Sequence, residues 1–124
     1  MAQFARPDAD DTDGNWTDKS GGSTLYTSID ESSADDDTTY IKVSDNGSNE
    51  ACIVRLSDVS APDSGNSYIK YKALTSDNAF TGDPPDLKLV LLQGSSVKAT
   101  TTNSSVNTSS WTAYSYTISD TSGI

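Results

Sequence analysis

Apolar and polar residues alternate over short stretches of this chain, and no stretch carries the 3.6-residue apolar period of an amphipathic helix. The segment "SYIKYKAL" (67–74) is the clearest case, because alternate residues of a strand point to opposite faces. Ile69, Tyr71 and Ala73 fall on one face, and the two lysines between them fall on the other. The remaining segments expected to be strands are "STLYTSI" (23–29), "TTYIKV" (38–43), "ACIVRLSDV" (51–59), "LKLVLLQ" (87–93), "SVKATTT" (96–102) and "WTAYSYTI" (111–118).

Turn-forming residues separate these segments. The sequence "DNG" (45–47) favours a hairpin turn, and "QGSS" (93–96) is short enough to join two strands as a hairpin. The two prolines of "TGDPPD" (81–86) exclude that segment from a central strand. Seven or eight short strands at this spacing predict an all-β fold, an antiparallel β-sandwich of jelly-roll-like type.

The alternation also predicts which side chains form the core. The predicted core residues are Ile29, Ile41, Val54, Leu56, Ile69, Tyr71, Leu89, Leu91 and Tyr114. Residues 87–92 are apolar on both faces, because Val90 and Leu92 lie opposite the leucines, beside Lys88. A strand that is apolar on both faces is usually covered on both. A loop of the chain or another subunit would supply the second cover.

Length and the position of the first expected strand predict the domain organisation. We expect residues 1–13 to form an N-terminal arm and acidic segment, and residues 14–124 to form a single β-sandwich domain. The sequence "MAQFARPDAD" lacks the apolar region of a secretory signal, so we expect synthesis in the cytoplasm.

The formal net charge is −10, which disfavours direct binding to nucleic acid or to an anionic membrane. The chain has no histidine, which excludes Ser-His-Asp and Cys-His catalysis and the usual zinc sites. Cys52 is the only cysteine, and its apolar neighbours predict a buried position. We therefore expect a protein that is not an enzyme and that needs no cofactor.

Two acidic clusters, at residues 8–15 and 34–37, could in principle supply oxygen ligands for calcium. The first fails the EF-hand pattern, because Ala9 stands at the first ligand position and Ser20 where the glutamate belongs. We expect that folding does not require calcium, although a calcium site of another type stays open.

Aromatic residues leave a second alternative open. Trp16, Trp111 and Tyr68 could stack on sugar rings, or the two tryptophans could close the ends of the core. The period-2 pattern does not decide between these roles.

The order of several short motifs resembles a known group of proteins. "RPDAD" (6–10) precedes "GNWT" (14–17), "LYTSIDE" (25–31), "DDTTYI" (36–41), "RLSDVSAPDSG" (55–65), "LLQGSSVKAT" (91–100) and "SSWTAYSYTIS" (109–119). This order resembles small jelly-roll-like virion structural proteins of tailed bacteriophages, including phages of cyanobacteria. Some of those proteins are head cement or decoration proteins, and others are modules of tail or receptor-binding proteins. Sequences of this kind often continue into one further strand beyond the last motif.

The resemblance implies a non-enzymatic cement or decoration protein that binds the outer surface of the phage head, stabilises it and acts as a homotrimer. The implied partners are the major capsid protein and further copies of the chain, and the implied location is the virion. The alternatives are a tail-associated receptor- or glycan-binding module and a carbohydrate-binding domain of an enzyme. The expected capsid contacts are Met1, Ala2, Gln3, Phe4 and Arg6, and the expected subunit contacts are the uncharged Tyr68, Val90, Leu92, Ile118 and Ile124.

Overall fold

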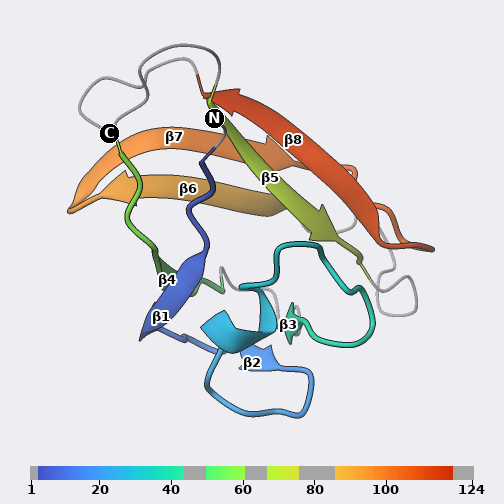
Figure 1. Cartoon of the computed structure of the whole chain (residues 1–124). Helices are drawn as coiled ribbons and strands as arrows, with labels where there is room; N and C mark the ends of the chain where they lie inside the picture. Colours follow the sequence, from blue (N-terminus) through green and yellow to red (C-terminus); the bar gives the residue numbers. More distant parts are fainter. Residues whose placement is uncertain (1–2, 44–49, 61–66, 76–85, 119–124) are drawn as a thin grey trace. The chain divides into compact units, whose positions relative to one another are not determined.

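Eight β-strands and one turn of 3₁₀-helix make up the regular structure of the described residues (Figure 1). The computed structural model describes residues 3–43, 50–60, 67–75 and 86–118. The elements are β1 (Pro7–Thr12), β2 (Thr17–Asp18), η1 (Tyr26–Ser28), β3 (Ile41–Lys42), β4 (Ile53–Leu56), β5 (Ser67–Ala73), β6 (Leu87–Gln93), β7 (Ser96–Asn103) and β8 (Thr112–Ile118). Every strand pairing is antiparallel, so the predicted all-β fold is confirmed. None of the described residues belongs to a helix that is long and apolar enough to cross a membrane.

The chain divides into two compact units, an N-terminal unit (Met1–Ser60) and a C-terminal unit (Ala61–Ile124). The N-terminal unit contains the pairs β1–β4 and β2–β3, and the C-terminal unit contains the pairs β5–β8 and β6–β7. The single domain expected for residues 14–124 stays a prediction.

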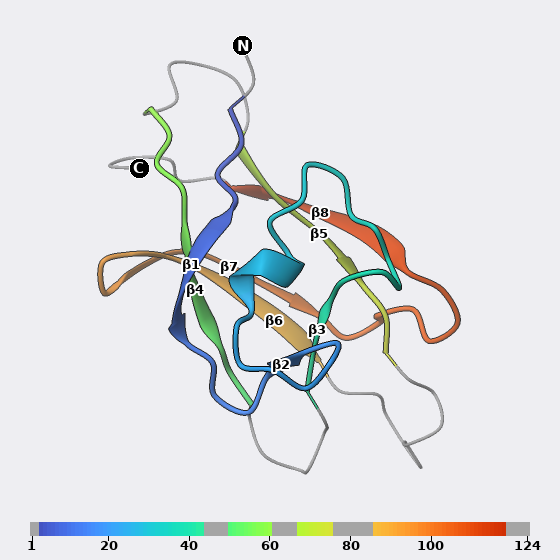
Figure 2. The same ribbon diagram turned by 60° about the horizontal axis from the view of Figure 1, so that its bottom comes forward.

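Strand β1 lies within residues 1–13, where the sequence predicted an N-terminal arm and acidic segment. It runs antiparallel to β4, with register shifts on either side of Ala9 and Asp10 (Figure 2). The Asp10 carboxylate accepts hydrogen bonds from the backbone N–H groups of Leu25 and Tyr26, both at 2.8 Å. These two backbone amides, distant in sequence, stabilise the negative charge of Asp10, which allows this acidic residue to lie within a packed strand.

The predicted strand at 23–29 is wrong. Two i→i−3 backbone bonds, from Ser28 to Leu25 and from Ile29 to Tyr26, form the turn η1 instead. The Asp10 carboxylate favours this turn because it binds the first two amide groups, which a strand would direct to opposite sides. Leu25, at the start of the turn, is fully buried.

The C-terminal unit follows the predicted alternation closely. In β5, Ile69 and Tyr71 are half-buried and Ala73 is buried, whereas the residues between them are exposed. In β6, Leu89 and Leu91 are half-buried. The predicted hairpin after β6 is confirmed, because Gln93 pairs with Ser96 and Gly94 adopts φ +60° between them.

Side chains on the half-buried faces connect the two strand pairs of this unit. Tyr71 and Tyr114 are register partners whose rings stack at 5.3 Å. The Asn103 side-chain amide of β7 lies 3.4 Å from the Tyr71 hydroxyl, so the half-buried faces of the two pairs are turned toward each other. The Tyr114 hydroxyl accepts the Asn107 N–H at 2.8 Å, and Asn107 O accepts the Thr75 N–H at 3.0 Å. The Tyr114 hydroxyl and the Thr75 amide thus satisfy the two backbone groups of Asn107, in the loop before β8.

The predicted core residues lie on inward-facing sides of the structure, with one exception, Leu56. Leu56 is 41% exposed, because β4 is only four residues long and its pairing with β1 is irregular. The other eight predicted core residues are half-buried. Among the described residues the buried apolar side chains are Leu25, Ala73, Val106 and Ile118.

Candidate interaction surfaces

The expected N-terminal arm is tied to the chain after β4. The Gln3 side-chain carbonyl accepts the Ser60 N–H at 2.8 Å. Arg6 N–H donates to the Ser57 hydroxyl at 3.1 Å, and Ser57 N–H donates to Arg6 O at 2.8 Å. These bonds extend the β1–β4 pairing, so residues 3–6 are held against residues 57–60 rather than projecting freely.

Phe4 is nevertheless presented to solvent. Its side chain is 60% exposed, and the Arg6 guanidinium carbon lies 5.1 Å from the ring centroid. An arginine at this distance interacts with the aromatic ring and restricts its orientation. The arm therefore offers one held aromatic side chain, whereas Met1 and Ala2 lie outside the described residues.

The outer side of β6–β7 forms an apolar face, made of Val90, Leu92 and Val97. Leu92 and Val97 are register partners, and Val90 pairs with Thr100. Their exposed fractions are 42% for Val90, 40% for Leu92 and 61% for Val97. The sequence predicted the outward position of Val90 and Leu92 but not the role of Val97. The position of Val97 follows from the two-residue turn at Gly94, because that turn sets the register in which Val97 pairs with Leu92.

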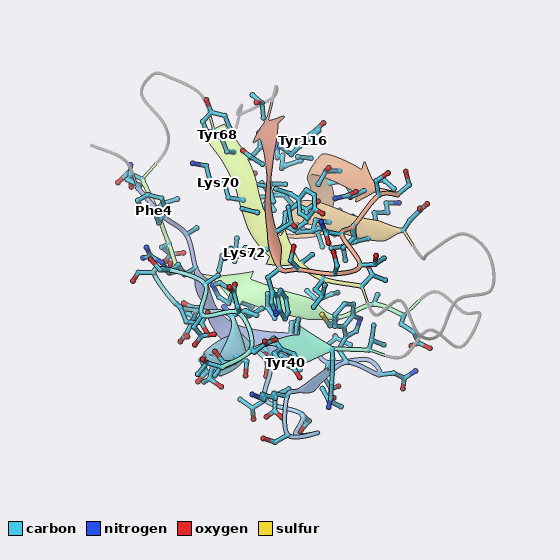
Figure 3. The ribbon with its side chains drawn as sticks, turned by 90° about the vertical axis from the view of Figure 1, so that its right-hand side faces the viewer. Phe4, Tyr40, Tyr68, Lys70, Lys72 and Tyr116 are labelled. Carbon is cyan, nitrogen blue, oxygen red and sulfur yellow. The ribbon has the colours of Figure 1, made fainter. Side chains whose placement is uncertain are left out.

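The outer side of β5–β8 forms a second surface, the lysine face, made of Tyr68, Lys70 and Lys72. All three project along β5 (Figure 3), and Tyr116 lies on the other side of the pair. Their register partners on β8 are the small exposed residues Thr117, Ser115 and Ala113, respectively. The Lys70 ammonium lies 5.4 Å from the Tyr68 ring centroid. Small neighbours leave these longer side chains accessible.

The structure does not gather the expected subunit contacts into one surface. Val90 and Leu92 belong to the apolar face and Tyr68 to the lysine face. Ile118 is only 8% exposed and is the register partner of Ser67 on the half-buried face of β8, so it is not available for an external contact. Ile124 lies outside the described residues.

The acidic clusters serve local structure. Thr39 donates its backbone N–H to Asp35 at 2.9 Å, and its hydroxyl lies within hydrogen-bond distance of both Asp35 oxygens and of Glu31. The backbone and side-chain bonds from Thr39 lower the pKa of Asp35, which keeps this carboxylate ionised. In the part of the chain that the structure describes, no three acidic or thiol side chains gather into a group that could hold a metal ion. That folding does not require calcium stays a prediction.

Cys52 is half-buried rather than buried. Burial, together with the negative charge of Asp10, raises the pKa of its thiol, which favours the neutral and less reactive form. Of the aromatic residues considered for sugar stacking, Trp16 and Trp111 are half-buried and Tyr68 is 46% exposed. The Trp16 indole N–H donates to Glu50 O at 3.2 Å, which fixes that ring within the N-terminal unit.

Comparison of the chain with known protein families, with curated proteins and with solved structures finds no match.

Proposed function

We propose that this chain is a non-enzymatic cement or decoration protein of a bacteriophage head, which binds the outer surface of the shell and acts as a homotrimer. The observation that carries the proposal is the presence of two exposed apolar features, Phe4 on the arm and the apolar face of β6–β7. A protein that joins a shell to further copies of itself needs two such contacts. The order of the sequence motifs supports the same function.

The proposal includes the finer architecture. Each unit pairs its strands two by two, and in the C-terminal unit the half-buried faces are turned toward each other. Stacked antiparallel pairs are the building principle of sandwiches and jelly rolls. We propose that the strand pairs assemble into a jelly-roll-like sandwich.

Phe4 is the proposed anchor to the major capsid protein. A single aromatic side chain that enters a pocket on a partner can supply much of the binding free energy. The Arg6 guanidinium and the backbone bonds of residues 3–6 hold the anchor in place, which lowers the entropy lost on binding. Gln3 and Arg6 therefore act by positioning Phe4.

Substituting Phe4→Ala tests this attachment with undecorated heads of the phage that carries the gene. We expect the affinity for heads to fall by about tenfold or more, because the substitution removes the aromatic anchor. The bond from Ser60 to Gln3 is unaffected, so the arm stays in place. Attachment of the unmodified protein is expected to persist in high salt, since an apolar contact is not screened.

Ile53→Ala is the matched control, because Ile53 is an exposed apolar residue of the same unit. Its head binding is expected to equal that of the unmodified protein, as measured by cosedimentation. Unchanged binding of Phe4→Ala would refute the role of the arm.

The second candidate function is a tail-associated receptor- or glycan-binding module. Tyr68 favours it, because this exposed ring lies on an open strand face beside Lys70, in reach of a sugar or its charged substituent. Localisation to the tail and loss of receptor binding in Tyr68→Ala would select this function over the first.

A further inference from the structure

The negative charge of the chain is divided unequally between its two units. The N-terminal unit holds 13 Asp and Glu against 4 Lys and Arg, for a net charge of −9. The C-terminal unit holds 5 against 4, for a net charge of −1. Coulomb repulsion therefore opposes a contact between two N-terminal units far more than a contact between two C-terminal units. A surface through which copies of this chain meet is expected in the C-terminal unit.

The apolar face of β6–β7 carries little charge even within this unit. Neither of its strands contains Asp or Glu. Lys88 is exposed on the same side, but it pairs with Thr102 at the end far from the turn. Lys98 is half-buried at the register shift and already interacts within the chain. At the turn end, the exposed side chains of Leu92 and Val97 form an uncharged pair.

Strand β6 is apolar on both sides, and the described part of the chain covers one of them. Leu89 and Leu91 are half-buried on the side that is turned toward β5–β8. Val90 and Leu92 are exposed on the other side, so the described residues do not supply the second cover that such a strand usually has. Sheets pack face to face with interdigitated side chains, and the equivalent face of another copy is a suitable cover.

We propose that the apolar face is the contact between copies, and that it meets the same face of the other copies around the axis of the homotrimer. The inference rests on the proposed function and deepens it, since it names the occupant of one of the two apolar features. Side chains close to a symmetry axis meet their own counterparts, so a charged group there faces a like charge, whereas an apolar group is compatible with itself. Leu92 and Val97 therefore lie closest to the axis, and Lys88 lies at the rim.

This arrangement narrows the subunit contacts expected from the sequence. Val90 and Leu92 are kept, and Val97 is added. Tyr68 is left out, because the Lys70 ammonium lies 5.4 Å from its ring centroid. A contact of Tyr68 with its own counterpart would bring these ammonium groups together, which like-charge repulsion opposes.

Sedimentation velocity of the purified full chain tests the inference. The unmodified protein is expected to self-associate. Raising NaCl from about 50 mM to about 500 mM should leave its dissociation constant unchanged or lower it, because salt screens the net negative charge but not an apolar contact. Leu92→Asp should weaken association by about tenfold or more, since it places one carboxylate of each copy near the axis. An unmodified chain that stays monomeric, or that dissociates in high salt, would overturn the inference.

Tyr68→Asp is the matched control for Leu92→Asp. Each substitution replaces an exposed, uncharged side chain on a seven-residue strand of the C-terminal unit, and each changes the net charge equally. Only Leu92→Asp is expected to weaken association, and equal effects would show that net charge alone acts and would overturn the inference. Thermal melts check that both variants fold. Val97→Asp, at the more exposed register partner, provides the same test should Leu92→Asp fail to fold.

Mixing Leu92→Asp with Leu92→Lys identifies the occupant of the apolar face. Each variant alone should associate weakly, because like charges meet at the axis. The mixture should associate at least about fivefold more tightly than either variant, since a carboxylate of one chain then faces an ammonium group of the other. If the apolar face bound a different surface of the next copy, mixing would restore nothing, and that result would overturn the inference.

Head binding separates this inference from the proposed function. A Leu92→Asp chain that decorates heads and still self-associates like the unmodified protein refutes the contact and leaves attachment to the head intact. An unmodified chain that self-associates as expected but does not bind heads refutes the proposed function and leaves the contact intact. If Leu92→Asp abolishes head binding without affecting self-association, the apolar face binds the shell, and the inference is wrong.

Discussion

Replacing Leu25 with alanine is expected to lower the free energy of unfolding by about 2–5 kcal/mol, because removing a buried leucine side chain loses apolar burial and leaves a cavity. Leu25 is fully buried, directly before η1. A domain of ordinary stability has about 5–15 kcal/mol in total, so this loss is severe. Urea titration followed by tryptophan fluorescence measures it.

Leu56→Ala is the matched control for this prediction. Leu56 lies in the same unit and has the same side chain, but it is 41% exposed. Its substitution should cost less than about 1 kcal/mol, since little buried area is lost. If Leu56→Ala costs as much as Leu25→Ala, the burial of the N-terminal unit is misassigned.

Replacing Gly14 with alanine is the second large expected effect. Gly14 has φ +57°, a conformation that costs an L-residue about 1–2 kcal/mol. An added Cβ would also overlap the backbone carbonyl of Ala51, and such overpacking typically costs a further 1–3 kcal/mol or so, about 2–5 kcal/mol in all. Neighbouring bonds from Trp16 and Asn15 to Glu50 hold the two segments together, so neither can move away easily.

Gly94→Ala separates the cost of the backbone conformation from the cost of the steric overlap. Gly94 has φ +60°, and no atom lies within 4 Å of the position of an added Cβ. Its substitution should therefore cost only the conformational term, about 1–2 kcal/mol. A chemical denaturation in which Gly14→Ala is no more destabilised than Gly94→Ala would contradict the close approach of Ala51.

The sequence correctly predicted the long strands and the tight hairpin of the C-terminal unit, which show clear local patterns. Strands β5, β6 and β8 each run for seven residues, and alternation over that length is distinctive. The hairpin between β6 and β7 followed from its turn residues, because Gly94 accepts a positive φ. These two features together give the apolar face and the outward position of the lysines.

The structures of residues 7–12 and 23–29 were not predicted correctly, because they depend on interactions between residues distant in sequence. The sequence "PDADDT" of β1 has no apolar alternation, and its strand conformation depends on pairing with β4. The turn η1 depends on the Asp10 carboxylate, 15 and 16 residues before the amides that it binds. No local pattern encodes such a bond, so the segment that holds Leu25 was predicted as a strand.

The candidate surfaces were predictable in part for the same reason. Alternation placed Tyr68, Val90 and Leu92 outward, which the structure confirms. It could not show that residues 3–6 are held against residues 57–60, because these bonds join the two ends of the N-terminal unit. Ile118 was expected to contact another subunit, whereas pairing with β5 buries it.

Counting copies in purified particles tests the proposed function most directly. Quantitative mass spectrometry of virions from the phage that carries the gene gives the ratio of this chain to the major capsid protein and to the tail proteins. A cement protein of the head should occur in a fixed stoichiometric ratio to the major capsid protein and remain on heads separated from their tails. Recovery with the tails, at the copy number of tail proteins, would contradict the proposed function and favour the receptor-binding alternative.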